Sequence, residues 1–125
     1  MPDPPAAERP GLSIDMIASD LFLASSCRGT AVSAGASFRQ HVSVAKFAAA
    51  EASDGPVLCD LTLRDAEPET VRDAAAGRVL VGYAPHRQVG RLKAAREAGF
   101  DVVTTNSGLA DVLRRVLQQG PTASD

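Results

Sequence analysis

The sequence has few aromatic residues, with no tryptophan, one tyrosine and four phenylalanines among its 125 residues. Because 45% of the residues are nevertheless hydrophobic, the core must be built mainly from valine, leucine and alanine packed closely between layers. A chain of this length has room for one domain. The composition therefore favours a single domain in which helices pack on a sheet.

The sequence also lacks long apolar runs and blocks of one charge. No stretch approaches the roughly 20 apolar residues that span a bilayer, so we expect a soluble protein without a membrane partner. The 13 basic and 15 acidic residues are interspersed and give a net charge of -2. Since no basic block could follow a phosphate backbone, nucleic acid is not expected as a partner.

Cysteine pairs and glycine-rich loops are missing as well. Cys27 and Cys59 do not form a CxxC pair, and no secretory signal precedes them, so a reducing cytoplasm is the expected location. Gly29 and Gly35 lie too far apart for a phosphate-binding loop, and Gly82 is followed by Tyr-Ala-Pro. Nucleotide binding is therefore disfavoured.

Short apolar runs alternate five times with longer segments of helical spacing. This alternation predicts a parallel sheet covered by helices on both faces. Asp20 suits the N-cap of the first helix, and Gly35 and Gly99 suit helix C-termini. The expected strands are 12–18, 37–42, 56–61, 78–82 and 102–104, and the expected helices are 22–34, 44–52, 68–75, 87–98 and a last one capped by Ser107.

Apolar residues at helical spacing mark the buried faces of the last two helices. The fourth helix carries Val89, Leu92, Ala95 and Ala98, and the fifth carries Leu109, Val112, Leu113, Val116 and Leu117. The two ends are rich in proline, alanine and polar residues. We therefore expect a folded domain at 12–119 between disordered tails at 1–11 and 120–125.

Two aspartates stand where predicted strands end: Asp20 after the first strand and Asp60 at the end of the third. The carboxyl ends of parallel strands form the edge where open α/β folds bind their ligands. The sequence therefore predicts an acidic pocket at that edge. Asp20 fits two roles, the cap of the first helix and a ligand of a cation, and the sequence leaves both open.

The most specific stretches are Val-Leu-Val-Gly-Tyr-Ala at 79–84 and Ala-Ala-Arg-Glu-Ala-Gly-Phe-Asp at 94–101. With five βα units and aspartates at these places, residues 14–117 resemble the CheY-like receiver domain of two-component response regulators. The resemblance implies a flavodoxin-like three-layer α/β sandwich, with a five-stranded parallel sheet in the order 2-1-3-4-5. It also implies a signalling protein that is not an enzyme.

In receivers of the ordinary kind, an aspartate ending the third strand accepts a phosphoryl group, and an acidic pair after the first strand holds Mg²⁺. Asp60 matches the phosphoacceptor, but Ser19 replaces one acid of the pair and leaves only Asp20. Because one carboxylate ligand is lost, the resemblance implies at most a weak Mg²⁺ site at Asp20 and Asp60. No other cofactor is expected.

Three further pocket positions depart from the family. Tyr83 stands where a serine or threonine contacts the phosphoryl oxygens, Asn106 replaces a lysine that pairs with them, and Arg64 replaces a proline. Since phosphoryl transfer depends on positioning and charge stabilisation, we expect an atypical or pseudo-receiver with weak or absent phosphorylation of Asp60. Arg64 either swings back to supply positive charge or forms a solvated ion pair with Asp65.

The leading interpretation is a single-domain receiver that signals by binding another protein or a second copy. In the family, the fourth helix, fifth strand and fifth helix form the contact face, which implies residues 88–90, 103–106 and 110–115 here. One alternative is a competent phosphorelay receiver that accepts phosphate on Asp60 from a histidine kinase. Another is an enzyme or small-ligand binder on the same sheet. Flavin binding, however, would need a Ser/Thr/Gly-rich first loop, and residues 19–23 are apolar after the acid.

Several other residues have simpler explanations. His86, in the turn after the fourth strand, is expected to be a solvated loop histidine, and His41 has no identifiable partner. Cys59 should point to the face opposite Asp60 and be a small core residue. Residues 21–23 cannot all face the sheet from consecutive helical positions. At least one is therefore expected near the surface, where it would mark a contact.

Overall fold

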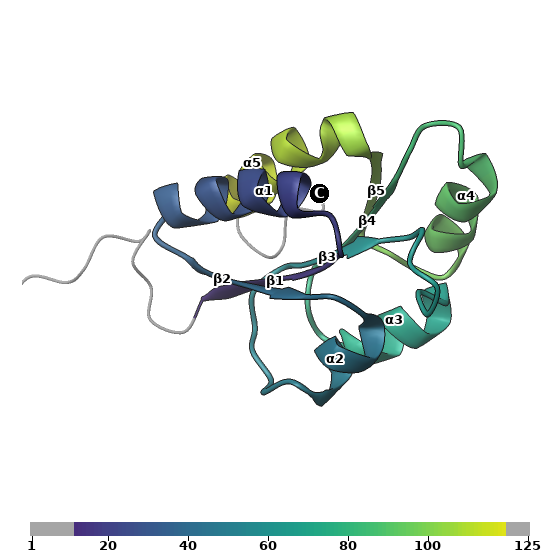
Figure 1. Ribbon diagram of the computed structural model, residues 1–125, viewed down its shortest axis with the longest axis horizontal. Coiled ribbons are helices and arrows are strands. Elements are labelled where there is room, and N and C mark those ends of the chain that lie inside the picture. Colours follow the sequence, from purple (N-terminus) through teal and green to yellow (C-terminus); the bar gives the residue numbers. More distant parts are fainter. Residues whose placement is uncertain (1–11, 120–125) are drawn as a thin grey trace, which may run out of the picture.

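The computed structural model describes residues 12–119, and the tails predicted at 1–11 and 120–125 lie outside the described residues. Within this range, five parallel strands form one sheet in the order β2-β1-β3-β4-β5 (Figure 1). The predicted α/β fold and its strand order are confirmed. The strands are β1 Ser13–Ile17, β2 Ser37–His41, β3 Val57–Asp60, β4 Leu80–Ala84 and β5 Val102–Thr105.

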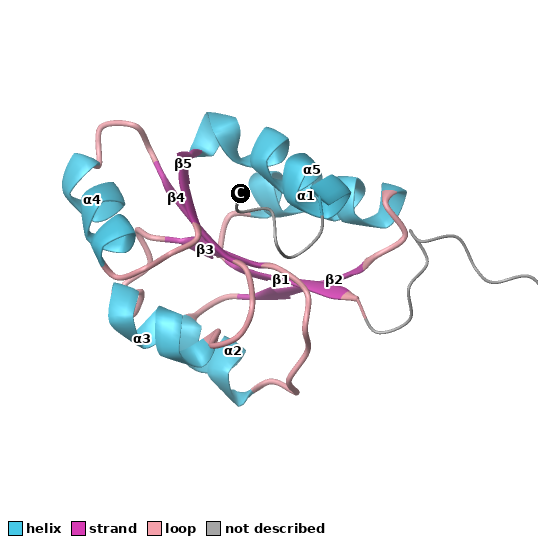
Figure 2. Cartoon of the chain, turned by 180° about the vertical axis from the view of Figure 1, so that it is seen from behind, coloured by secondary structure: helices cyan, strands magenta, loops and turns pink. Residues whose placement is uncertain are grey.

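Helices cover both faces of the sheet, as predicted (Figures 1 and 2). One face carries α1 and α5, and the other carries α2, α3 and α4. None of the helices in the described range combines the length and the apolar character needed to cross a bilayer. The helices are α1 Leu21–Ser33, α2 Val44–Ala49, α3 Pro68–Ala74, α4 Val89–Glu97 and α5 Leu109–Gln119, with a short 3₁₀ helix at Asn106–Gly108 before α5.

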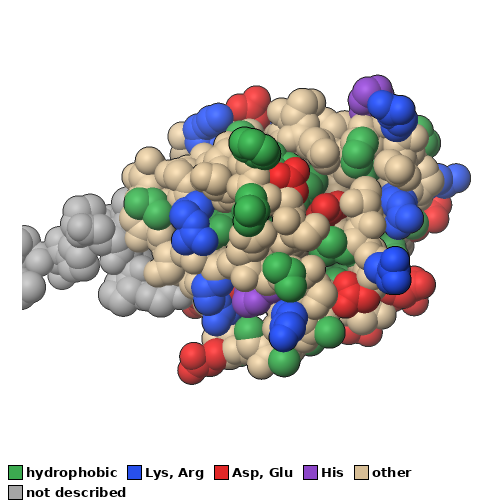
Figure 3. Space-filling view, in the orientation of Figure 1, with side chains coloured by type: hydrophobic (Ala, Val, Ile, Leu, Met, Phe, Trp, Pro, Cys, Tyr) green, Lys and Arg blue, Asp and Glu red, His purple; other side chains and the backbone are tan. Residues whose placement is uncertain are grey.

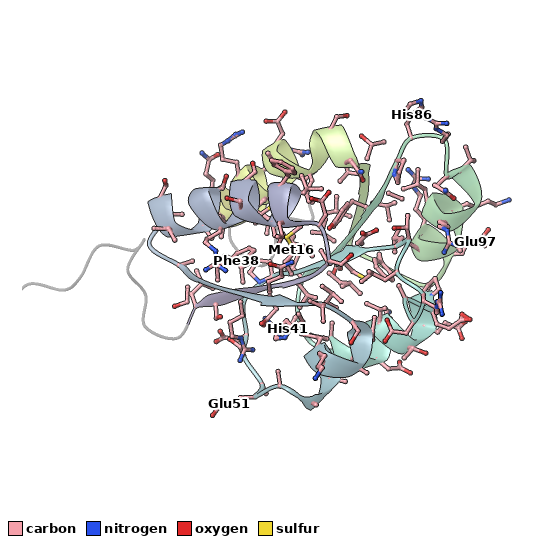
Figure 4. All side chains as sticks on the ribbon, in the orientation of Figure 1. Met16, Phe38, His41, Glu51, His86 and Glu97 are labelled. Atoms are coloured by element: carbon pink, nitrogen blue, oxygen red, sulfur yellow. The ribbon has the colours of Figure 1, made fainter. Side chains whose placement is uncertain are left out.

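The sheet separates two apolar cores, because side chains alternate between the faces of a strand. Along β1, Ile14 and Met16 belong to the core under α1 and α5, whereas Ile17 belongs to the core under α2, α3 and α4. Figure 4 shows Met16 on the α1 side of the sheet and His41 on the α2 side. Asp15 lies between Ile14 and Met16 and therefore faces α2, on the same side as His41.

Some element boundaries differ from the prediction. β4 begins at Leu80, so Arg78 lies in the loop before the strand and not within it. α2 ends at Ala49 because Ala50 is extended, with φ -78° and ψ 161°. Gly35 and Gly99 do end helices, with φ of 81° and 95°, which confirms their predicted role.

Two predictions for the ends of helices were wrong. Val89, the first residue of α4, was predicted on its buried face but is 67% exposed. Ser107 does not cap α5. It lies within the 3₁₀ helix, and its hydroxyl lies 3.2 Å from Oγ1 of Thr105. Of the apolar stripe predicted for α5, Leu109, Val112, Leu113 and Val116 are buried, and Leu117 is partly buried.

Candidate functional site

Asp20 lies directly before α1 and caps it. Its Oδ1 accepts hydrogen bonds from the backbone N–H groups of Phe22 at 2.8 Å and Leu23 at 3.3 Å. Of the two roles that the sequence left open, capping is therefore confirmed. Oδ2 of this exposed carboxylate has no hydrogen-bond partner among residues 12–119. One oxygen thus remains available to a ligand.

Asp60 ends β3 at the same edge of the sheet, because the strands run parallel. Its Oδ1 accepts hydrogen bonds from the N–H group of Thr62 at 2.9 Å and from its hydroxyl at 2.7 Å. Asp60 is half-buried, and no described residue bonds to its Oδ2. The phosphoacceptor candidate therefore stands at an accessible edge with one oxygen free of internal contacts.

Tyr83 is paired with Asp60 on the neighbouring strand, so both side chains point to the same face of the sheet. The ring is 1% exposed and belongs to the core under α1 and α5. Its hydroxyl has no hydrogen-bond partner among residues 12–119, which typically costs about 1 to 3 kcal/mol. Burial, together with the nearby negative charge of Asp60, raises the pKa of Tyr83 well above its usual range. The phenol is therefore a neutral core side chain.

Asp65 ties the loop after β3 to α2. Its two carboxylate oxygens accept hydrogen bonds from the N–H groups of Val44 and Ala45, both at 3.0 Å. The preceding residue, Arg64, is exposed. Neither the predicted Arg64–Asp65 ion pair nor a contact between Arg64 and Asp60 occurs among the described residues. The Asp65 carboxylate instead accepts hydrogen bonds from the N–H groups at the start of α2, where a negative charge is favourable.

The edge around Asp20 and Asp60 contains little positive charge. Ser19 and Asn106 are exposed there, after β1 and β5. No lysine or arginine of the described range lies within ion-pair distance of either carboxylate. Arg91 of α4 comes near but donates to the backbone carbonyl of Leu61 at 3.0 Å.

These residues fit a dedicated Mg²⁺ site poorly. Mg²⁺ needs near-octahedral oxygen ligands and usually binds one or two carboxylates together with waters or phosphate oxygens. Both Asp20 and Asp60 already accept internal hydrogen bonds. Nowhere in residues 12–119 do three or more His, Cys, Asp or Glu side chains gather so that they could hold a metal ion. Weak Mg²⁺ binding therefore stays a prediction.

The most extensive polar network lies away from this edge, around the fully buried Asp15. Its Oδ1 accepts from Nε of Arg39 and lies against Nε2 of His41, both at 2.7 Å. Its Oδ2 accepts from Nη2 of Arg78 at 2.7 Å and Nη2 of Arg39 at 3.2 Å. The two arginines also donate to three backbone carbonyl groups, those of Ser13, Glu51 and Gly55.

This network was not predicted, and its member Asp15 is a partner of His41 that the sequence did not identify. Burial raises the pKa of Asp15, but hydrogen bonds from Arg39, His41 and Arg78 outweigh it and hold the pKa below its usual range. One sequence signal could have revealed the network. An aspartate between apolar neighbours, in a strand expected to be buried on both faces, requires a cationic partner. Arg39 lies directly opposite Asp15 on β2.

The remaining predictions concern single side chains. Cys59 is fully buried on the face opposite Asp60, as predicted, and burial raises the pKa of its thiol well above the ordinary range. Leu21 and Phe22 are both exposed, which confirms that residues 21–23 do not all face the sheet. His86 lies exposed in the turn after β4 (Figure 4).

Neither a protein-family model nor a curated protein sequence matches the chain. Among solved structures, ShkA Rec1 in complex with c-di-GMP is 20% identical with a TM-score of 0.62, over 86% of this chain and 94% of that one. Full-length ShkA in complex with AMPPNP is 21% identical with a TM-score of 0.69, over 96% of this chain and 25% of that one.

The RcsB response regulator of Salmonella typhimurium is 9% identical with a TM-score of 0.68, over 91% of this chain and 65% of that one. The chain thus spans only part of RcsB and a quarter of full-length ShkA. At these identities the likeness establishes the fold alone. Together with the strand order and the edge that carries Asp60, it shows that the chain has the fold of response-regulator receiver domains.

Proposed function

We propose that this chain is a receiver-like signalling module that acts by binding another protein, with weak or absent phosphorylation of Asp60. The surroundings of Asp60 carry this proposal. Among residues 12–119 its carboxylate is bonded only to Thr62, and no cation lies within ion-pair distance. A phosphoryl group brings up to about two negative charges, so efficient transfer to Asp60 requires positive charge that this edge does not provide.

We infer that the partner, or a second copy of the chain, binds the side formed by α4, β5 and α5. Residues 88–90 are exposed there, and Val89 presents an apolar side chain to solvent. Arg114 and Arg115 are exposed on α5. A face that mixes one exposed apolar side chain with exposed charged ones suits a protein contact with a polar rim.

The proposal can be tested with the single tyrosine of the chain, because the chain has no tryptophan and Tyr83 lies beside Asp60. Mg²⁺ and then acetyl phosphate are added while tyrosine fluorescence and intact mass are followed. We expect no phosphate on the wild-type chain and no change in fluorescence. A phosphate adduct that Asp60→Asn abolishes would favour the alternative, a competent phosphorelay receiver served by a histidine kinase.

The same fluorescence signal tests the small-ligand alternative. ShkA Rec1 was crystallised with c-di-GMP, which makes this dinucleotide a suitable probe. At the edge beside Tyr83, the unpaired oxygens of Asp20 and Asp60 repel its two phosphates, so we expect no saturable change. A saturable change that persists in Asp60→Asn would show a small-molecule site on the chain. It would contradict the proposal that the chain acts by binding another protein.

A further inference from the structure

The edge of the sheet that carries Asp20 and Asp60 also exposes large apolar side chains. Leu21 and Phe22 open α1 and are 74% and 91% exposed, and Val42 follows β2 and is 58% exposed. We call these three residues the edge patch. Leu21 and Phe22 follow β1, whereas Val42 follows β2. These residues form one surface only if the two turns lie next to each other.

The two turns leave the sheet side by side, because β1 and β2 are neighbouring parallel strands. The backbone N–H of Ala18 donates to the carbonyl of His41 at 2.8 Å, and Nε2 of Gln40 donates to the carbonyl of Ala18 at 2.8 Å. These bonds hold the end of β1 beside the end of β2, so the loop that leads to α1 leaves the sheet next to the turn that carries Val42. A single exposed apolar residue is ordinary, but a nearly bare phenylalanine within an apolar group marks an interaction surface.

Two carboxylates adjoin the edge patch. Asp20 directly precedes Leu21, and Asp60 ends the strand next to β1. Each uses Oδ1 for internal hydrogen bonds, and each Oδ2 lacks a partner within the described range. Figure 3 shows hydrophobic and acidic side chains close together in the middle of this face. The surface therefore combines apolar area with uncompensated negative charge.

We propose that the edge patch and these two carboxylates bind a segment of a partner protein that carries a lysine or arginine flanked by apolar residues. The partner's cation donates to the free oxygens of Asp60 and Asp20, and its apolar residues cover Leu21 and Phe22. The partner thereby supplies the positive charge that Asn106 does not. This inference rests on the proposed function, that the module acts by binding another protein, and it names a contact separate from the face formed by α4, β5 and α5.

Charge selects this kind of partner over the other large molecules that an apolar patch could meet. Unpaired carboxylates repel the phosphates of nucleic acid and of anionic lipid. A cation flanked by apolar groups matches both features of the surface at once. The face of the Phe22 ring adds a further attraction for a lysine or arginine.

The test uses the full chain and a short acetylated and amidated peptide with one lysine between leucines, together with a matched peptide that has glutamate for lysine. Binding is followed by NMR of the ¹⁵N-labelled chain. The lysine peptide is expected to shift the amide signals of residues 20–22, 42 and 60–62. The glutamate peptide is expected to leave them unchanged.

Single substitutions assign the binding to the surface. Phe22→Ser should weaken binding of the lysine peptide by about tenfold or more, as expected for the loss of a covered phenylalanine. Asp60→Asn should weaken it by about threefold to tenfold, as expected for one charge pair. Val32→Ser is the apolar control, since Val32 is 62% exposed at the other end of α1. Asp73→Asn is the charge control, because Asp73 is exposed on α3.

Three results would overturn the inference: no shift with the lysine peptide at millimolar concentration, equal binding of the glutamate peptide, or equal losses in Val32→Ser and Phe22→Ser. None of these results bears on the phosphate assay or on the face formed by α4, β5 and α5, so the proposed function would stand. Efficient phosphorylation of Asp60 would instead overturn the proposed function, whatever the peptide does.

Discussion

Oδ2 of Asp15 lies 2.7 Å from Nη2 of Arg78, although 63 residues separate them in the sequence. The contact joins the middle of β1 to the loop before β4, and Arg39 and His41 of β2 complete the surroundings of the carboxylate. Phe47 of α2 packs against this cluster, with its ring centroid 5.4 Å from that of His41. The network thus joins β1, β2 and the loop before β4.

Replacing Asp15 with asparagine leaves Arg39 and Arg78 without their counter-charge. Removal of one partner from a buried ion pair typically costs about 3 to 5 kcal/mol, and Asp15→Asn should lower the free energy of unfolding in urea by that order. Asp111→Asn is the control, because Asp111 is 80% exposed in its pair with Arg114. Such exposed pairs contribute at most about 1 kcal/mol. Equal losses in the two variants would refute the structural role of Asp15.

The Asp15 carboxyl also makes the free energy of unfolding depend on pH in the acid range. Burial raises its pKa, but hydrogen bonds from Arg39, His41 and Arg78 bring it below the unfolded value of 3.8. Such a group stabilises the folded state above the unfolded pKa, and this contribution is lost as the pH falls through the folded pKa. The stability difference between wild type and Asp15→Asn in urea should therefore shrink below about pH 4. A difference that grows in acid would contradict the lowered pKa.

The hydroxyl of Tyr83, to which no residue in the described range bonds, predicts an unusual response to its removal. Because a buried hydroxyl without a partner costs about 1 to 3 kcal/mol, Tyr83→Phe should leave the free energy of unfolding unchanged or raise it. Tyr83→Leu also removes ring volume from the core and should lower it by about 2 kcal/mol or more. Urea unfolding distinguishes the two. If Tyr83→Phe were clearly destabilising, the hydroxyl would have a partner in solution.

The link between Asp65 and α2 can be tested in the same way. Asp65→Ala removes the acceptor of two N–H groups at the start of α2 and should cost about 1 kcal/mol. Faster hydrogen exchange at Val44 and Ala45 should accompany the loss. Arg64→Gln is the neighbouring control and should change stability by no more than about 0.5 kcal/mol. A larger effect of Arg64→Gln would show that Arg64 does pair with an acid.

The layers of the fold were predictable because they follow from local pattern. Short apolar runs that alternate with helical spacing leave few arrangements other than a parallel sheet between helices. The ends of strands and helices were less predictable where a contact with a residue far away in the sequence decides them. Arg78 reads as the start of a strand, but its guanidinium is held by Asp15 and the carbonyl of Gly55, which keeps it in the loop before β4.

The candidate site was predictable only in part. Asp20 and Asp60 could be placed because strand ends and helix starts are visible in the sequence. The hydrogen-bond partners of Asp65 could not be predicted, since they depend on where α2 begins in space. The apolar neighbours of Asp15 indicate that it needs a cationic partner, but they do not identify Arg78, which Asp15 meets only after the sheet has formed.

The sharpest measurement concerns the missing charge around Asp60. Ser19→Asp combined with Asn106→Lys restores a carboxylate and a cation at two exposed positions of the edge. After incubation with Mg²⁺ and acetyl phosphate, intact mass spectrometry should show one added phosphate on this double variant, lost when Asp60→Asn is included. The wild-type chain should remain unmodified. A phosphate of similar occupancy on the wild-type chain would contradict the proposal that Asp60 lacks the surroundings for phosphoryl transfer.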